Sequence, residues 1–201
     1  MTEPIVKRPG TAVVIACCSP SFHIGLNGQL LGHVPGDLPM FKKLTRGHIV
    51  VMGWNTFLSI PGGILPNRVN IVYVNYTRCT PEQKAYLHGC EAEGVIFKFS
   101  MNEAIDAGIA LSEDRVEDNK VCYVIGGEAM YKYALETDRV GKVILTVAHK
   151  SLPKDVGDAS FPIDLLDVKS GKWHMVERPL LVDKDGVPSE DIVQIYRHKG
   201  N

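Results

Sequence analysis

Asp37 is the acidic residue whose neighbours make it the strongest candidate for chemistry. It precedes a run in which Leu38, Phe41 and Leu44 recur at helical spacing. Most aspartates in such a position are helix N-caps, whose carboxylate accepts backbone N–H groups. A second interpretation is a carboxylate at the mouth of an apolar pocket flanked by Leu38 and Phe41. Such a carboxylate can accept two adjacent N–H groups of a ligand through charge-assisted hydrogen bonds.

Glycines at the ends of two strand-like runs favour phosphate binding. Gly126 and Gly127 end one such run and precede a helical segment. Gly53 ends another, and the next helix is expected to start at Asn55-Thr56. Glycine lets the backbone approach a ligand closely, and the free N–H groups of a helix N-terminus attract anions. A bare diglycine is a weak signal, so the phosphate-binding interpretation depends on its position between a strand and a helix.

Five apolar runs rich in β-branched residues predict the strands that position these residues. They are residues 11–18, 48–53, 69–74, 121–127 and 142–147. Continuous apolar runs of this length are typical of central strands that are buried on both faces. Helical segments lie between them, so we expect parallel β–α–β units.

Helix start signals support this alternation. Residues 80–83, Thr-Pro-Glu-Gln, combine an N-cap, a proline at the first helical position and a capping-box glutamine. Ser100 and Glu103 predict a second capping box, and a short helix is expected just after Gly127. The last third differs, because residues 173–177 and 192–197 look like two strands, which Asp185-Gly186 could join in a hairpin.

Length and composition fit one globular domain. The chain has 201 residues, of which 45% are hydrophobic and 22% charged, and its formal net charge is -1. This balance gives no electrostatic reason to expect nucleic acid or membrane partners, and no apolar run is long enough to span a bilayer. We expect a single α/β domain over residues 1–201, with residues 1–10 as a polar lead-in. Its central, mostly parallel sheet is flanked by helices and carries an antiparallel C-terminal strand pair.

The five cysteines indicate reducing surroundings. Their number is odd, two are adjacent and no Cys-x-x-Cys occurs, so neither a disulfide framework nor a zinc site is expected. Cys17, Cys18 and Cys122 lie in apolar strand-like runs, where cysteine acts as a small hydrophobe. The N-terminus also lacks the apolar stretch of a secretory signal. A cytoplasmic protein is therefore expected.

The order of motifs from Ile24 to Asn70 resembles the dihydrofolate reductase family. The motifs are an Ile-Gly and Asn-Gly loop, Pro-x-Asp-Leu-x-x-Phe-Lys, Thr-x-Gly, Val-Val-Met-Gly, Thr-Phe-x-Ser-Ile-Pro and Leu-Pro-x-Arg-x-Asn. Further on, Val-Ile-Gly-Gly-Glu-Ala-Met-Tyr at 124–131, Leu145-Thr146 and Gly-Asp-Ala-Ser-Phe-Pro at 157–162 continue the family's pattern. The resemblance covers residues 12–162, with a weaker match to the C-terminal strands.

The resemblance implies NADPH-dependent reduction of 7,8-dihydrofolate to 5,6,7,8-tetrahydrofolate by direct hydride transfer, in one-carbon and thymidylate metabolism. In that family the aspartate at the position of Asp37 is the key acid and the only ionisable side chain that contacts the pterin. It accepts the amino group and the adjacent ring N–H, which fixes the ring. This pairing favours protonation at the imine nitrogen beside the carbon that receives hydride, with water supplying the proton. Antifolate-type small molecules are further expected ligands.

The resemblance also implies a substrate site around Asp37. Arg68 matches an arginine that binds the carboxylate of the folate glutamate tail in a bidentate pairing, and Lys42 adds a weaker charge. Thr146 matches a threonine that hydrogen-bonds the aspartate. The other substrate-binding positions are Ile15 and Ile125 through their carbonyl groups, Leu38, Phe41, Ile60 and Leu65 as walls of the cleft, and Tyr131 near the nicotinamide.

For the cofactor, the resemblance implies a mobile lid over the nicotinamide from Ile24 to Leu31, and phosphate contacts at the two glycine sites. It also implies a cis peptide between Gly126 and Gly127. The cofactor-binding positions are Cys17, Ile24, Gly25, Leu30, Gly53, Trp54, Asn55, Thr56, Val74, Asn75, Tyr76, Ile125, Gly126, Gly127, Glu128, Ala129, Met130 and Tyr131.

Three features depart from the family's pattern. Leu31-Gly32 stands where the lid usually has Pro-Trp, whose tryptophan supports ordered water near the pterin. Trp54 stands where an arginine or lysine often reads the adenosine phosphates; a tryptophan can stack on adenine but cannot pair with a 2′-phosphate. Arg78 is the nearby basic residue that could substitute, so NADPH stays the expected cofactor. Glu128 follows the diglycine and is expected to point outward, because it would repel a phosphate.

Two other functions remain open from the sequence. A riboflavin-pathway reductase of the same fold acts on a ribosylated pyrimidine and needs a phosphate site in place of the Asp37 and Arg68 pair. A non-catalytic pterin-binding or structural protein that kept the fold is favoured only by the altered lid. The sequence favours the reductase acting on dihydrofolate, as a monomer without nucleic acid or membrane partners.

Overall fold

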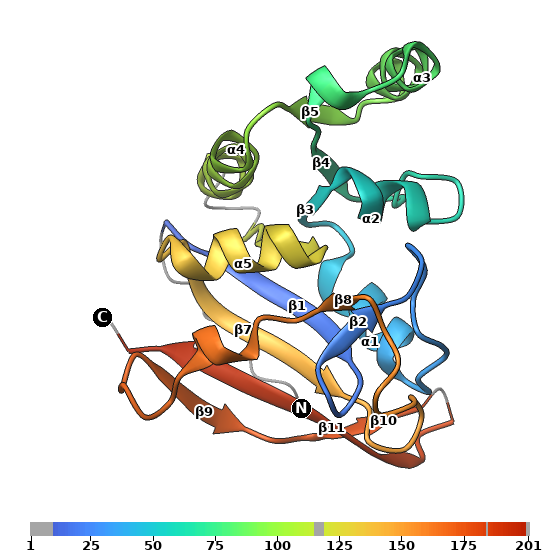
Figure 1. Ribbon diagram of the computed structural model, residues 1–201. Helices are drawn as coiled ribbons and strands as arrows, with labels where there is room; N and C mark the ends of the chain where they lie inside the picture. The colour runs from blue at the N-terminus through green and yellow to red at the C-terminus, as the bar shows by residue number, and fades with distance from the viewer. Residues whose placement is uncertain (1–9, 115–118, 184, 200–201) are drawn as a thin grey trace.

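The computed structural model describes residues 10–114, 119–183 and 185–199 of the chain. A twisted nine-stranded sheet runs through the molecule (Figure 1). Six neighbouring strands are parallel, in the order β7 (Val140–Val147), β1 (Ala12–Cys18), β6 (Cys122–Gly126), β3 (Ile49–Gly53), β4 (Val69–Tyr73) and β5 (Ile96–Lys98). The predicted α/β fold with a central, mostly parallel sheet is confirmed. The predicted lead-in 1–10 lies almost wholly outside the described residues.

The C-terminal strands form the antiparallel edge of the sheet. β11 (Pro188–His198) pairs with β7 on one side and with β9 (Trp173–Glu177) and β10 (Leu180–Val182) on the other. The predicted antiparallel arm is confirmed, but the prediction of a single strand pair is wrong. β10 lies inside the expected connection, and the turn with Asp185-Gly186 joins β10 to β11. A three-residue strand is too short to leave a readable alternation.

Helices cover both faces of the sheet. The layer of core residues that contains Val50, Val72 and Val193 lies under α1 (Asp37–Thr45), α2 (Trp54–Ser59) and α3 (Pro81–Ala92). The layer on the opposite face lies under α4 (Met101–Glu113) and α5 (Glu128–Glu136). Two short 3-10 helices, η1 (Tyr76–Arg78) and η3 (Ile163–Leu166), follow β4 and β8. The site residues on α1 and α2 therefore belong to one face.

Local helix signals decide where two of these helices begin. The capping box of α3 is confirmed, because Thr80 Oγ1 accepts the Gln83 N–H at 3.2 Å and Gln83 Oε1 accepts the Thr80 N–H at 2.9 Å. At α4, Ser100 Oγ accepts the Glu103 N–H at 3.1 Å, which confirms the N-cap, but the predicted second capping box is incomplete in the described chain because only α3 shows the return bond. A helix also follows Gly127, as predicted. These caps satisfy N–H groups that have no partner inside the helix.

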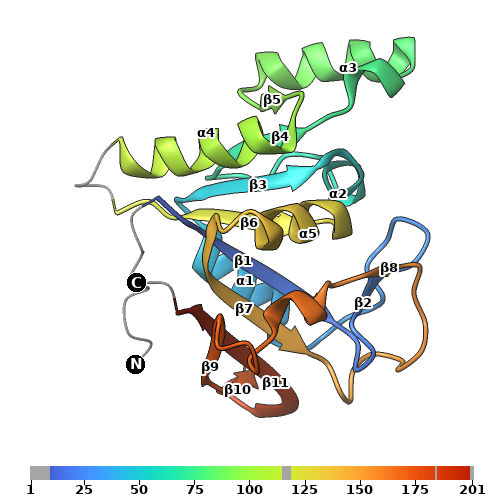
Figure 2. The ribbon, with the colours of Figure 1, turned by 60° about the vertical axis from the view of Figure 1, so that its left-hand side comes forward.

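A small second sheet lies at the carboxyl ends of β1 and β7 (Figure 2). It consists of β2 (His23–Gly25) and β8 (Ala159–Ser160), which pair antiparallel. The two strands come from segments more than a hundred residues apart, so this sheet joins the region of the predicted lid to the loop after β7.

None of the five cysteines, all of which lie in the described part of the chain, forms a disulfide, and Cys18, Cys90 and Cys122 are buried. Within residues 10–114, 119–183 and 185–199, no helix has the length and apolar character needed to cross a membrane.

Candidate active site

Asp37 is the first residue of α1, and its side chain is not used to cap the helix. The N-cap is Gly36, with φ at 87°, and no described side chain makes a capping hydrogen bond there. A Cβ at Gly36 would clash with the carbonyl oxygen of Val182, so only glycine fits. The N-cap interpretation of Asp37 is therefore wrong. Its carboxylate is available to groups on the sheet below.

Those groups are Cys17 on β1 and Thr146 on β7, which are direct neighbours in the parallel pairing of the two strands. Burial raises the pKa of the Asp37 carboxyl above its ordinary value. The Thr146 hydroxyl and the Cys17 thiol lower this pKa as hydrogen-bond donors, and Asp191 raises it through charge. The Thr146 hydroxyl is buried, and the Asp37 carboxylate is the acceptor that it faces. A carboxyl with a raised pKa in a cleft is suited to handling a proton.

Apolar side chains next to Asp37 form an uncovered surface. Leu38 is 52% exposed. Phe41, Ile60 and Leu65 are half-buried against the core layer below. Exposed apolar groups beside a half-buried carboxylate are typical of a cleft for a planar, amphipathic ligand.

Arg68 is held in place by the end of the same helix. Its Nε donates to Thr45 Oγ1 at 2.8 Å, and its two terminal nitrogens donate to the carbonyl groups of Pro66 at 2.7 Å and Lys42 at 3.4 Å. The guanidinium carbon lies 5.8 Å from the centre of the Phe41 ring. A guanidinium fixed in this way is ready to bind a carboxylate at low entropic cost.

Asn70 is a residue whose role the sequence did not indicate. It is buried, and its Oδ1 accepts the Leu65 N–H at 3.1 Å. Its Nδ2 donates to the carbonyl groups of Leu65 at 2.9 Å and Arg68 at 3.2 Å. Asn70 thus fixes the loop that carries both a cleft wall and the arginine. The signal was its place inside the motif Leu-Pro-x-Arg-x-Asn, where a buried asparagine needs partners.

Two turns that are formed by glycines lie close to each other beside this cleft. Gly53 is the N-cap of α2, and Gly127 is the N-cap of α5. A Cβ on Gly53 would lie 3.8 Å from the Gly127 nitrogen, and a Cβ on Gly126 or Gly127 would lie 3.3 Å from Thr56 Oγ1. The expected cis peptide between Gly126 and Gly127 is confirmed, whereas α2 begins at Trp54 rather than at 55–56. Close backbones, a hydroxyl and helix N-termini together fit a diphosphate group.

Glu128 points away from this cradle. Its side chain is exposed, and Oε2 accepts the N–H of Ser160 on β8 at 3.2 Å. The expected outward orientation is confirmed. The first residue of α5 is thereby joined to the small sheet.

Trp54 packs among aromatic rings. Its ring lies 5.7 Å from Phe57, 6.2 Å from Tyr86 and 6.3 Å from Phe97, measured between ring centres. The indole N–H is buried without a hydrogen-bond partner in the described part of the chain. Much of the Trp54 ring therefore packs α2 against α3 and β5.

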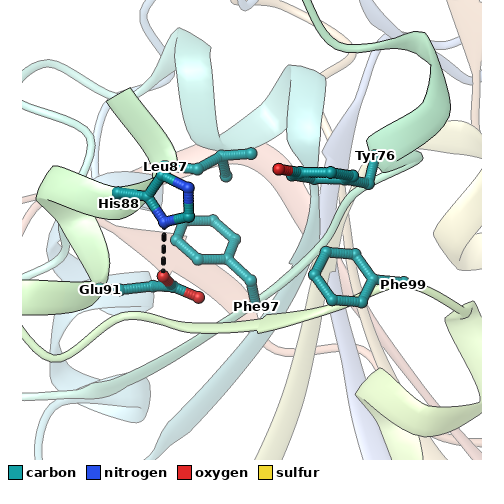
Figure 3. Close-up of a pocket in the computed structure, with 6 residues that line it drawn as sticks. All are labelled: Tyr76, Leu87, His88, Glu91, Phe97 and Phe99. Carbon is teal, nitrogen blue, oxygen red and sulfur yellow. Dashed lines mark hydrogen bonds and ion pairs between the residues drawn. The ribbon is translucent and has the colours of Figure 1, made fainter. Parts of the chain in front are cut away.

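An aromatic pocket opens farther along the same edge, where β4 and β5 end. Tyr76 and Phe99 stand at its mouth, with ring centres 5.4 Å apart, and Lys84 Nζ lies 4.6 Å from the centre of the Tyr76 ring. Figure 3 shows both rings across from His88 and Glu91 of α3, whose side chains are paired at 3.2 Å. The pocket has a volume of about 280 Å³ and is lined by Tyr76, Leu87, His88, Glu91, Phe97 and Phe99.

The other predicted positions lie around these features. Tyr131 is buried, and its hydroxyl donates to the Ile15 carbonyl at 2.9 Å. Val74 and Met130 are buried; Ile24 and Ile125 are half-buried; Gly25 has little exposure; Leu30, Lys42, Asn55, Asn75 and Ala129 are exposed. The structure thus groups Asp37, Thr146 and Cys17 closely, and places Asn75 and Tyr76 at the far end of the edge.

The predicted lid, residues 24–31, is tied to the loop before β8. Leu26 and Gln29 exchange two backbone hydrogen bonds around Asn27 and Gly28, which both have positive φ. Asp158 Oδ2 accepts the Asn27 N–H at 2.8 Å, and the Asp158 N–H donates to the Gly25 carbonyl at 3.0 Å. Asp158 holds the lid against the body of the protein, a role that its exposed, turn-rich sequence does not reveal.

Replacing Asp158 with alanine is expected to slow turnover about 3- to 10-fold, because a charge-assisted hydrogen bond to the lid is lost. Pre-steady-state measurement of the chemical step and of ligand release checks this. Asp155→Ala is the comparison, because Asp155 accepts from Ser21 Oγ at 2.7 Å outside the lid tip. Equal effects of the two variants would contradict a specific role of the lid contact.

Comparisons with known proteins agree with this geometry. The family model described as Dihydrofolate reductase matches residues 11–189. The chain is 32% identical over 182 residues to "Dihydrofolate reductase HdrB" of Haloferax volcanii, covering 87% of this chain and 78% of that protein. It is 36% identical over 153 residues to a dihydrofolate reductase of Bacillus subtilis (strain 168), covering 76% and 74%.

A solved structure is similar over almost the whole chain. It is a dihydrofolate reductase from Enterococcus faecalis complexed with NADP(H) and RAB-propyl, with a TM-score of 0.68 and 23% identity, covering 95% of this chain and 98% of that one. This similarity supports the fold, and the family model covers most of the sequence. The chain belongs to the dihydrofolate reductase family.

Proposed function

We propose that this chain reduces 7,8-dihydrofolate to 5,6,7,8-tetrahydrofolate with NADPH, and that Asp37 is its catalytic acid. The observation that carries the proposal is the half-buried Asp37 carboxyl with its raised pKa, next to an uncovered apolar surface and on the same helix that anchors Arg68. The relatives from Haloferax volcanii and Bacillus subtilis are named dihydrofolate reductases, and the Enterococcus faecalis enzyme is a complex with NADP(H).

Asp37 would orient the pterin ring and keep a proton nearby. Its two oxygens can accept the amino group and the neighbouring ring N–H of the pterin. Thr146 and Cys17 offer donors to the same carboxylate and so fix its position. Negative charge on this side of the ring favours protonation of the imine nitrogen before hydride arrives at the adjacent carbon. The Ile15 and Ile125 carbonyl groups are the proposed acceptors for the pterin amino group.

Arg68 would bind the carboxylate of the glutamate tail. Its guanidinium is fixed by three hydrogen bonds at the opposite end of α1 from Asp37. A nine-residue helix is long enough for the two charges to hold opposite ends of an extended substrate. A riboflavin-pathway substrate has a phosphate and no pterin, so this arrangement of acid and arginine favours folate.

The cofactor would bind across the carboxyl ends of β6, β3 and β4. Gly53, Gly126, Gly127 and Thr56 would hold its diphosphate, because no side chain blocks the backbone there. The adenosine half would then extend toward Tyr76 and the neighbouring pocket. When bound, NADPH supplies the hydride. The free thiols also support a cytoplasmic location, and we propose a monomer.

Gly53→Ala is expected to weaken NADPH binding about tenfold, which corresponds to about 1.4 kcal/mol. The backbone at Gly53 has φ -82° and ψ 162°, which alanine adopts without strain, and the nearest atom to the new methyl group is in the flexible side chain of Met130. The added methyl group would lie 3.3 Å from Met130 Cγ and 3.8 Å from the Gly127 nitrogen, and so would occupy space beside the Gly126–Gly127 turn. Equilibrium titration of the protein with NADPH measures the effect.

Gly89→Ala is the matched control for this substitution. A Cβ at Gly89 meets no described atom within 4 Å, and the residue lies inside α3. It should leave NADPH affinity unchanged and raise the free energy of unfolding by up to about 1 kcal/mol. Unchanged NADPH affinity in Gly53→Ala would contradict the proposed diphosphate site.

The function is tested by following NADPH oxidation with dihydrofolate, with a ribosylated pyrimidine of the riboflavin pathway as the comparison substrate. Oxidation that depends on dihydrofolate and is absent with the pyrimidine supports the proposal. A folded protein that binds a pterin without turnover would instead support a non-catalytic pterin-binding protein.

A further inference from the structure

Asp191 is a fully buried carboxylate to which the mechanism above gives no role. It lies near the start of β11 with 0% exposure. Its oxygens accept the Lys150 N–H at 2.9 Å, the Ser151 hydroxyl at 2.5 Å and the Ser189 hydroxyl at 3.3 Å. Burial raises the pKa of Asp191, but these donors outweigh it and leave the pKa below its ordinary value. Asp191 is therefore a buried negative charge at neutral pH.

The strand register places this charge beside the Asp37 site. Val193 of β11 lies directly opposite Thr146 of β7, and Asp191 is two residues before Val193 on the same face. Diagonal neighbours of this kind have side chains about 7–8 Å apart. Val193 and Ala148 belong to the core layer under α1, so protein rather than water fills the space around them. Thr146, in turn, faces Asp37.

Other groups around Asp37 carry no charge at neutral pH. Thr146 and the Cys17 thiol face Asp37, and the Cys18 thiol on β1 and the Tyr131 phenol on α5 lie in the core layer on the opposite face of the sheet. Burial raises the pKa of Cys17 and Tyr131, and raises that of Cys18 to about 12, so all three keep their protons. Beside Asp191, Lys150 and Glu190 form an exposed ion pair at 3.0 Å, in which the two charges offset each other.

We propose that Asp191 is a positioning residue whose buried negative charge holds the catalytic proton at the site formed by Asp37 and the pterin. A fixed negative charge stabilises a proton on the Asp37 carboxyl and equally on the imine nitrogen of the ring above it. Water and salt screen this charge weakly because it has no solvent contact. The inference rests on the proposed function, since it concerns the proton used in that reaction.

The test compares Asp191→Asn with Glu190→Gln. Both remove one negative charge at adjacent positions, but the Glu190 side chain is 73% exposed and its charge is screened. The hydride-transfer rate of the wild type should fall as pH rises and the site loses its proton. In Asp191→Asn the midpoint of this fall should move to lower pH by roughly half a pH unit or more, whereas Glu190→Gln should leave it in place.

A second control separates charge from structure. Ser151→Ala removes one of the hydrogen bonds that hold the loop after β7 to Asp191, yet it keeps the charge. It should lower the melting temperature without moving the midpoint. A shift as large as that of Asp191→Asn would overturn the proposal, because the loop contact rather than the charge would then be responsible.

A titration without substrate gives a readout independent of turnover. Carbon-13 NMR of the aspartate carboxyl groups should show the pKa of Asp37 lowered in Asp191→Asn and unchanged in Glu190→Gln. An unchanged Asp37 titration in folded Asp191→Asn would overturn the proposal. If that variant does not fold, the wild-type spectrum tests the premise, because an Asp191 that keeps its proton to a higher pH than Asp37 would overturn the proposal. If the Asp37 and Asp191 carboxyl groups of the wild type titrate as expected but the protein does not turn over dihydrofolate, the proposed function is wrong. The electrostatic effect of Asp191 on Asp37 would then still stand.

Discussion

Replacing Asp37 with asparagine is expected to lower the rate of dihydrofolate reduction about 10²-fold or more at neutral pH. Asparagine keeps the size of the side chain but cannot accept two ligand N–H groups with a negative charge. The imine nitrogen of the pterin then loses the group that favours its protonation. Single-turnover hydride transfer measured from pH 5 to 9 checks this, and the loss should be smaller at acid pH, where solvent protonates the substrate directly.

The same substitution should raise stability at neutral pH. Because burial raises the pKa of Asp37 in the folded protein, the ionised carboxylate costs stability. This cost is absent below the unfolded pKa and grows as pH rises through the folded pKa. Asp37→Asn should therefore melt above the wild type at pH 7 and lose this advantage toward acid pH. A less stable Asp37→Asn at pH 7, with the exposed Asp155→Asn as control, would contradict the burial of charge at this position.

Arg68→Leu is expected to raise the KM for dihydrofolate about 10- to 100-fold with little change in kcat. The guanidinium is proposed to bind the tail, which lies far from the reacting atoms. Steady-state kinetics with dihydrofolate and with a reduced pterin that lacks the glutamate tail measure the effect. The KM should rise only for the substrate that carries the glutamate tail.

Two controls accompany Arg68→Leu. Arg46→Leu removes an exposed cation just after α1 and should leave both substrates unaffected. A circular dichroism melt reports the cost of losing the Arg68 bonds to Thr45 and Pro66. An equal rise in KM for the tail-less pterin would show that Arg68 shapes the cleft instead of binding the tail.

The sequence predicted the parts of the fold that depend on local patterns. Buried parallel strands and the capping box at Thr80 follow from runs of residue types, and both are confirmed. The short strands β5 and β10 were not predicted, because three residues at a sheet edge leave no periodicity. The cap interpretation of Asp37 rests on local grounds and is wrong, because Gly36 occupies the N-cap position and Val182 leaves no room there for a Cβ.

The residues that the sequence did not reveal depend on distant partners. Asp158 and Asp191 look like ordinary polar residues in a turn or at a strand end. Their partners lie up to 131 positions away for Asp158, and 40 or 41 positions away for the Asp191 contacts with the loop after β7. Trp54 is similar, because its packing depends on Tyr86 and Phe97 from later segments. Tertiary contacts of this kind override local propensity.

Transfer of deuterium from cofactor to product tests the central claim most directly. NADPH that carries deuterium at C4 of the nicotinamide, on the face that is transferred, is incubated with dihydrofolate and the wild-type protein, and the tetrahydrofolate is analysed by mass spectrometry. One deuterium per product molecule, formed about 10²-fold more slowly by Asp37→Asn, is the predicted result. Product without deuterium, no product from a folded protein, or equal rates in the two proteins would contradict direct hydride transfer to a pterin held by Asp37.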